Sequence, residues 1–170
     1  MDAAKNLLLT AQAMQAELNV VRKPPEDNGR AATEVVVLRS LVKDTRGYIE
    51  RIANQVNGAY EKGWYDACAV MMRRLLETLL IEAFEAFGRA AAIQTSGGDF
   101  FFLRDMIDAA LKEPAWNLSR NCKQAMPRLK DVGDKSAHSR RFNAQRGDID
   151  RMLGDVRVVV QELVYLAKLK

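Results

Sequence analysis

The chain has 170 residues, of which 48% are hydrophobic and 28% charged, and its formal net charge is +4. This length suits one domain with a sizeable core, and the composition excludes an intrinsically disordered chain. Aromatic residues make up only 7%, which disfavours an all-β sandwich, and only four prolines and ten glycines interrupt the chain, so long helices are expected.

The first predicted element is a helix over residues 2–20, whose apolar residues recur at helical spacing. The stretch RKPPEDNGR, residues 22–30, predicts an exposed linker because it combines two prolines, an asparagine and a glycine with charged residues. We therefore divide the chain into an N-terminal helix with its linker, residues 1–31, and a helical domain, residues 32–170. The N-terminal helix is expected to act as an arm that packs on a neighbouring molecule.

Two long helical regions are predicted next. The first spans residues 32–62, and Thr45-Arg46-Gly47 is expected to kink or divide it. The second spans residues 64–87 and ends at Gly88, and its apolar residues cover most of its circumference, which is typical of a central helix. At its start, Tyr60, Trp64 and Tyr65 are expected to anchor the helix in the core, with a ligand cage as the alternative.

The second half of the chain predicts three shorter helices. Asp99 follows a pair of glycines and is expected to cap the first of them. The next is predicted over residues 119–130, with Pro127 bending or splitting it, and Gly133 is expected to mark a break after it. Asp148 is expected to cap the last. No segment alternates as a strand does, so the predicted fold is an all-α bundle of five or six helices with an N-terminal helical arm.

Metal, disulfide and membrane functions have little support in the sequence. Two cysteines and one histidine cannot supply the four ligands of a structural zinc site. Cys68 and Cys122 both fall in apolar helical patterns, which predicts two buried free thiols. A secretory signal is not expected, and the charges within the longest apolar segment, residues 65–87, exclude a membrane span. We expect a cytoplasmic protein with no cofactor, no metal and no membrane contact.

The positive charge is concentrated in one part of the chain. Residues 118–146 hold eight basic and two acidic side chains, so this segment carries +6 and the remainder −2. Such a patch attracts phosphates or acidic partners, although cations near helix ends also complement the helix dipole and keep a surface solvated. Phe142 is the one aromatic residue within the patch, so contact with a nucleic-acid backbone is favoured over base stacking. The candidate nucleic-acid-binding residues are Arg128, Lys130, Lys135, Arg140 and Arg141.

His138, the only histidine in the chain, lies inside this patch, in LKDVGDKSAHSRR. Ser136 and Ser139 flank it, but the sequence has no nucleophile elbow and no phosphate-binding loop. One histidine with arginines is compatible with metal-independent RNA cleavage, in which the histidine moves the proton of the 2′-hydroxyl and guanidinium groups stabilise the developing charge. A structural role for His138 and a binding role are the alternatives.

Two stretches together resemble a known family. YEKGWYDACAVMMRRLLETLL has an aromatic-rich helix start, small residues, an arginine pair and a Leu-Glu step, and LKDVGDKSAH is similar to a Gly-Asn-x-x-Ala-His turn with Asp134 at the asparagine position. Over residues 45–168 the chain resembles a bacterial domain family of unknown function that is often joined to restriction-enzyme subunits, and that family is similar to the HEPN superfamily. The residues of the first stretch that carry the resemblance are Tyr60, Trp64, Ala67, Cys68, Arg73, Arg74, Leu76 and Glu77.

The resemblance implies a HEPN-like helical bundle that forms a homodimer and takes part in phage defence. Many HEPN domains are metal-independent ribonucleases whose motif is an arginine, a polar residue, three variable residues and a histidine. Counted back from His138, the polar position is Asp134 and the arginine position holds Gly133. Arg128, Arg140 or Arg141 would therefore have to replace the motif arginine.

The resemblance also assigns supporting roles to the central helix. Arg73 and Glu77 are four residues apart and Arg74 and Glu77 three, so either arginine can pair with the glutamate. In a working ribonuclease, Arg73 or Arg74 with Glu77, and Asp134, would orient the site. In a protein without activity, the same pair would connect the central helix to the segment that holds His138.

Three functions follow as hypotheses. The leading one is an interaction or nucleic-acid-binding module, associated with defence and without turnover, whose partners are RNA or DNA and a second copy of the chain. The second is a metal-independent endoribonuclease that uses His138. The third is a structural adaptor for a neighbouring defence-system subunit.

Overall fold

The computed structural model describes Asn6, residues 9–14 and residues 31–170. The chain divides into two units, residues 1–30 and residues 31–170. In the first unit, Asn6 and residues 9–14 are helical, and Thr10 Oγ1 donates a hydrogen bond of 2.8 Å to the Asn6 carbonyl. The rest of the helix predicted over residues 2–20, and the whole of the predicted linker 22–30, lie outside the described residues.

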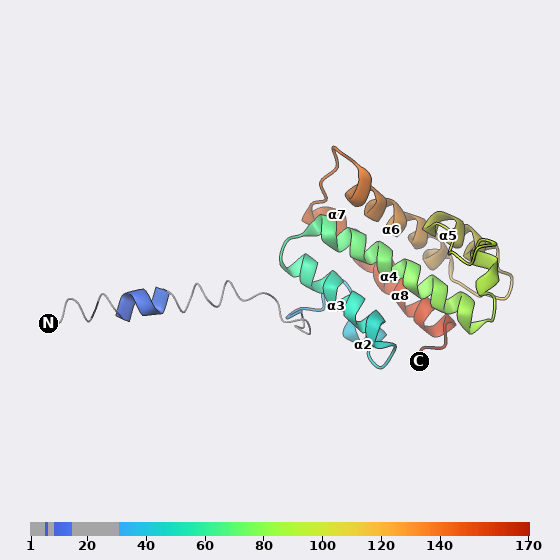
Figure 1. The fold of residues 1–170 in the computed structure, drawn as a ribbon, viewed down its shortest axis with the longest axis horizontal. Coiled ribbons are helices and arrows are strands. Elements are labelled where there is room, and N and C mark those ends of the chain that lie inside the picture. The colour runs from blue at the N-terminus through green and yellow to red at the C-terminus, as the bar shows by residue number, and fades with distance from the viewer. Residues whose placement is uncertain (1–5, 7–8, 15–30) are drawn as a thin grey trace. The chain divides into compact units, whose positions relative to one another are not determined.

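The second unit is an all-α helical bundle, as predicted (Figure 1). Its elements are α2 (Arg39–Val42), α3 (Gly47–Glu61), α4 (Tyr65–Ala86), the 3₁₀ helix η1 (Ala90–Ile93), α5 (Leu103–Lys112), α6 (Arg120–His138), α7 (Arg146–Asp150) and α8 (Leu153–Leu166). Over residues 31–170 the backbone pairing of β type is limited to an isolated bridge between Gln94 and Phe100. None of the described helices combines the length and the apolar character needed to cross a membrane.

Helix α4 is the central helix of the bundle. It packs against α3, α6 and α8, and Figure 1 shows it running between α3 and α6. Apolar side chains on most of its circumference are buried, as the breadth of its apolar pattern predicted. Gly88, at φ +65°, follows its end and confirms the predicted stop. These buried residues are Cys68, Ala69, Met72, Leu75, Leu76, Leu79, Leu80, Ala83 and Phe84.

A buried carboxylate joins α4 to the start of α3. The side chain of Glu82 is only 7% exposed, and Arg46 Nε donates to its Oε2 at 2.7 Å. The Tyr48 hydroxyl donates to the other carboxylate oxygen. Arg46 precedes α3 and Tyr48 lies in its first turn. The charge of Glu82 is therefore compensated at the end of the α3–α4 pair that is opposite the connecting turn.

The helix predicted to begin at residue 32 begins later, at Arg39. Val36 and Val37 are fully buried in a non-helical segment, and both of their N–H groups donate to Asn57 Oδ1 at 3.0 Å. Asn57 Nδ2 returns a hydrogen bond of 2.8 Å to the Val37 carbonyl. The buried side-chain amide of Asn57 therefore provides hydrogen-bond partners for the backbone of this segment, which a helical turn would otherwise have provided. The predicted division at residues 45–47 is confirmed, since α3 begins at Gly47.

Helix α6 continues through Gly133 to His138, so the predicted break at Gly133 is wrong. A Cβ atom at position 133 would lie 2.5 Å from Arg73 Cβ and 3.0 Å from the Ala69 carbonyl oxygen. The glycine is thus a point of close contact between α6 and α4. Pro127 lies inside α6 and does not split it, because the helix continues on both sides of the proline.

Two predicted caps have different outcomes. Asp99 does not cap α5, whose preceding residue is Phe102; instead the Asp99 carbonyl accepts from Thr95 N at 2.8 Å across the glycine turn. Asp148 lies inside α7, whose N-cap is Gln145, and its Oδ2 accepts from Gln145 N at 2.8 Å, so it completes a capping box and is not itself the N-cap. The single last helix of the prediction is divided into α7 and α8.

Candidate nucleic-acid interface

His138 is the last residue of α6 and is exposed. We call the segment that follows, residues 139–145, the basic loop because it contains Arg140 and Arg141. Figure 1 shows it protruding from the bundle between α6 and α7. Its far end is fixed to the start of α4, since Ala144 N donates to Asp66 Oδ1 at 2.9 Å.

Two of the five predicted binding cations are engaged by carboxylates. Arg128 forms a bidentate pair with Asp155, with N···O distances of 2.7 and 2.8 Å, and the hydrogen bond raises the pKa of Arg128. Lys130 Nζ lies 2.6 Å from Asp134 Oδ2, and this hydrogen bond raises the pKa of Lys130 against the opposing effect of its burial. These two side chains therefore have reduced capacity to bind a phosphate.

The other three predicted cations remain available. Lys135, Arg140 and Arg141 are exposed, and none has a carboxylate oxygen within 4.0 Å in the described part of the chain. They occupy the last turn of α6 and the start of the basic loop. Among the five predicted binding residues, these three neighbouring side chains are the ones without a carboxylate partner in the described chain.

Asp134 is the centre of a polar cluster between α6 and α4. Arg73 Nε donates to its Oδ1 at 2.6 Å, and Arg73 Nη1 lies 3.6 Å from Glu77 Oε2. Partial burial acts to raise the pKa of Asp134, but hydrogen bonds from Lys130 and Arg73 outweigh it, so this pKa is lowered. Arg73 and Glu77 thus belong to this cluster, whereas Arg74 is exposed and outside it, and the site-orienting role of these residues stays a prediction.

The polar cluster and His138 share one face of α6. Lys130, Asp134 and His138 are spaced by four residues, which places their side chains in one row along a helix. His138 lies one turn beyond Asp134 in that row. Position 133 cannot hold the motif arginine without displacing Arg73, yet Arg73 itself brings a guanidinium from α4 to the neighbouring Asp134.

The aromatic residues at the start of α4 divide into two groups. Tyr60 is buried, its hydroxyl donates to Asp150 Oδ1 at 2.5 Å, and its ring packs edge-on against Tyr65 with centroids 5.9 Å apart. Arg146 Nε donates to the Tyr60 oxygen at 3.3 Å. Tyr60 and Tyr65 therefore anchor the helix as predicted. Trp64 does not, because 61% of it is exposed.

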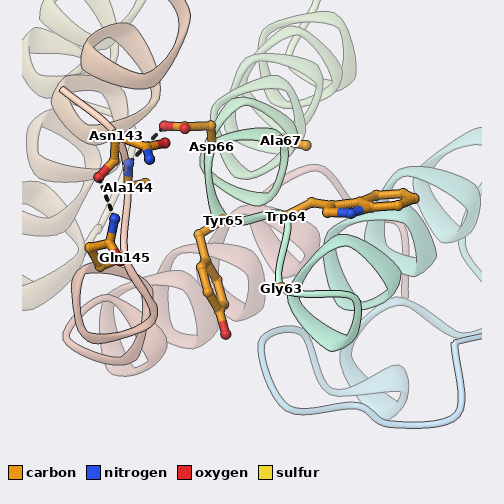
Figure 2. Close-up of a pocket in the computed structure, with 8 residues that line it drawn as sticks. All are labelled: Gly63, Trp64, Tyr65, Asp66, Ala67, Asn143, Ala144 and Gln145. Carbon is orange, nitrogen blue, oxygen red and sulfur yellow. Dashed lines mark hydrogen bonds between the residues drawn. The ribbon is translucent and has the colours of Figure 1, made fainter. Parts of the chain in front are cut away.

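A pocket of about 410 Å³ lies between the start of α4 and the end of the basic loop (Figure 2). The Asp66 carboxylate points toward Ala144 in this view, and the ring of Trp64 points to the other side of the α4 start. The sequence did not indicate this pocket, because its two walls are far apart in the chain. Its lining residues are Gly63, Trp64, Tyr65, Asp66, Ala67, Asn143, Ala144 and Gln145.

The described residues do not suggest metal or thiol chemistry at this interface. They contain no group of three or more His, Cys, Asp or Glu side chains placed to hold a metal ion. Cys68 and Cys122 are buried free thiols, as predicted, and burial raises the pKa of each to about 12. Neither thiol is therefore a ready nucleophile or ligand.

The chain was compared with known proteins. No protein-family model matches it, and no curated protein and no solved structure is significantly similar to it.

Proposed function

We propose that this helical bundle binds nucleic acid, without turnover, through the last turn of α6 and the basic loop. The observation that supports this proposal is the exposure of Lys135, Arg140 and Arg141 without carboxylate partners in the described chain. Cations in this state release counterions from a phosphate backbone on binding, which is the main source of sequence-independent affinity. Nearby Arg128 and Lys130 are engaged by Asp155 and Asp134 and contribute less.

The proposal is tested by comparing two double variants that remove equal charge. Arg140→Ala with Arg141→Ala removes two cations from the basic loop, and Arg120→Ala with Lys123→Ala removes two exposed cations from the opposite end of α6. Helix α6 has 19 residues, so its ends are about 28 Å apart. We expect the first variant to weaken binding and to reduce the slope of log Kd against log salt by about two, and the second to do neither.

Two outcomes would contradict the proposal. Equal losses in both variants would mean that the positive charge acts diffusely and that the basic loop is not the interface. Absence of binding to any RNA or DNA at low salt would remove nucleic acid as the partner. The remaining hypothesis would then be an adaptor for a neighbouring defence-system subunit, which predicts co-purification of that subunit with the folded chain.

We also propose that the chain is HEPN-like and acts as a homodimer, on the basis of the two sequence motifs that it shares with the family described above. A dimer would present two basic loops to one nucleic acid. Light scattering at micromolar protein concentration tests this, and a monomeric mass would contradict it.

A second candidate function, metal-independent RNA cleavage, is favoured by the Arg73–Asp134 contact. Arg73 places its guanidinium against Asp134, one helical turn before His138, although position 133 is a glycine, and would orient the site from α4. In that reaction His138 would transfer the proton, and Arg140 or Arg141, which have no carboxylate partner in the described chain, would stabilise the charged phosphorane. Wild type and His138→Ala, both checked for folding by circular dichroism, would be incubated with total RNA in EDTA. Cleavage by the wild type alone would support this candidate, and no cleavage by either would exclude it.

A further inference from the structure

We propose that the nucleic acid bound at the basic loop is single-stranded and that Trp64 stacks on one of its bases. This inference rests on the proposed function of the loop and adds the class of ligand. The sequence argued against stacking, because Phe142 is the only aromatic residue in the basic segment. The fold changes that argument by bringing Trp64 to the same end of the bundle.

Trp64 is a rigidly held but uncovered aromatic residue. Its backbone N–H donates to the Ala59 carbonyl at 2.8 Å, and its backbone carbonyl accepts from Cys68 N at 2.9 Å, so hydrogen bonds fix the backbone on both sides. Its side chain nevertheless stays exposed, and no described aromatic ring or cation lies against it. The other tryptophan, Trp116, is buried against Phe84 with ring centroids 4.5 Å apart. Trp64 is thus the one of the two that a base can reach.

The position of Trp64 relative to the basic loop is set by the start of α4. Trp64 and the end of the loop border the same pocket, and Asp66, two residues after Trp64, holds Ala144 at 2.9 Å. Figure 2 shows the ring on one side of the α4 start and Asn143, Ala144 and Gln145 on the other. A strand that crosses this start meets the end of the basic loop on one side, a few residues after Arg140 and Arg141, and the indole ring on the other.

The chemistry of the crossing point favours an unpaired strand. The Asp66 carboxylate lines the pocket on the loop side, where it disfavours a phosphate but can accept a hydrogen bond from an amino group of a base. Asn143 and Gln145 add amides that both donate and accept. Base edges and faces are accessible together only when the bases are unstacked and unpaired, whereas a duplex presents its phosphates and grooves.

The inference is tested with fluorescent oligouridylate, oligothymidylate and a duplex of the same length. We expect Trp64→Ala to weaken binding of the single strands about 5- to 150-fold and to leave duplex binding unchanged, since stacking on an aromatic side chain supplies affinity of that size. Trp64→Phe keeps a ring and should retain most of the affinity. Phe102→Ala is the control, because Phe102 is an aromatic residue that is 83% exposed but is not among the residues that line the pocket.

Tryptophan fluorescence gives an independent measurement. Single strands should quench the emission of the wild type but not that of Trp64→Phe, in which only the buried Trp116 remains. Quenching that persists in Trp64→Phe would contradict stacking on Trp64.

The outcomes separate this inference from the proposed function. If Trp64→Ala binds single strands like the wild type while the Arg140/Arg141 variant loses affinity, stacking is excluded and the basic loop remains the interface. If Trp64→Ala weakens single-strand and duplex binding equally, the assignment of a single-stranded ligand is wrong. If the wild type binds neither at low salt, both proposals fail. Loss of single-strand affinity in Trp64→Ala, with duplex binding unchanged, supports the inference.

Discussion

Arg73 Nε and Asp134 Oδ1 lie 2.6 Å apart, and this contact joins the central helix to α6 one turn before His138. It is possible because the residue before Asp134 is a glycine, over which the aliphatic part of Arg73 passes. The close approach of the two backbones and the ion pair are therefore parts of one contact. Because α6 leads directly into the basic loop, this contact also sets where the loop begins.

Replacement of Gly133 by alanine should destabilise the protein by about 1–3 kcal/mol, because the new Cβ would lie 2.5 Å from Arg73 Cβ. Gly58→Ala is the matched control, since Gly58 is also helical and has open space around its Cβ position. Alanine there should stabilise the protein by about 0.5–1 kcal/mol through its helix propensity. Urea unfolding of the two variants measures the difference, and a shift of the same sign in both would contradict the close-contact interpretation.

Replacement of Asp134 by asparagine should cost about 1 kcal/mol at neutral pH, a modest figure because about a third of the side chain is exposed. The pKa of Asp134 is lowered in the fold, so its contribution is complete above the ordinary value of 3.8 and is lost as the pH falls through the lower folded value. The stability difference between wild type and variant should therefore shrink in acid. Asp108→Asn, at an exposed site without an ion pair, should show no such difference. A difference that is independent of pH would argue against the charged contact.

Replacement of Tyr60 by phenylalanine should destabilise the protein by about 1 kcal/mol, because it removes the hydrogen bond to Asp150. That hydrogen bond and burial raise the pKa of Tyr60 above its ordinary value of 10.0, against the opposing effect of Arg146. The contribution is therefore complete below pH 10.0 and is lost as the pH rises through the folded value. Urea unfolding measured below and above pH 10.0 should show that the difference in unfolding free energy between wild type and variant becomes smaller in alkali. Tyr165→Phe, at a site 80% exposed, serves as the control.

Cys68 and Cys122 should resist alkylation by iodoacetamide in the native protein at mildly alkaline pH. Burial raises the pKa of both thiols to about 12, with a further contribution from Glu162 at Cys122, so almost no thiolate is present or accessible. Mass spectrometry should find no label on the folded chain and two labels after unfolding in urea. Rapid labelling of either cysteine in the folded chain would contradict its burial.

The parts of the fold that the sequence predicted are those where local pattern and packing agree. Helix α4 is an example, because its broad apolar pattern reflects contact on most sides and Gly88 ends it locally. The errors arose where a distant residue decides the local structure. Gly133 is a contact between helices and not a break, and the segment before α2 is held by Asn57, which lies about 20 residues further along the chain.

The sequence indicated which basic residues belong to the candidate site, but it could not show which of them are paired with carboxylates. The sequence indicated five binding cations, and the carboxylates that engage two of them, Asp155 and Asp134, are recognisable only once α6 is folded against α8 and continued past Gly133. The pocket beside Trp64 was missed for the same reason, since Asp66 and Ala144 are 78 positions apart.

Glu82 restricts how α3 and α4 can slide along each other. A displacement by one helical turn, about 5.4 Å, can bring other apolar side chains into the contact, so apolar faces discriminate between registers less sharply than a buried charge does. The same displacement would separate Glu82 from Arg46 and Tyr48 and leave a buried charge without partners, which costs about 3–5 kcal/mol. The two helices therefore have one permitted register. Glu82, near the C-terminal end of α4, therefore also determines the position of Trp64, which lies between α3 and α4 at the other end of the pair.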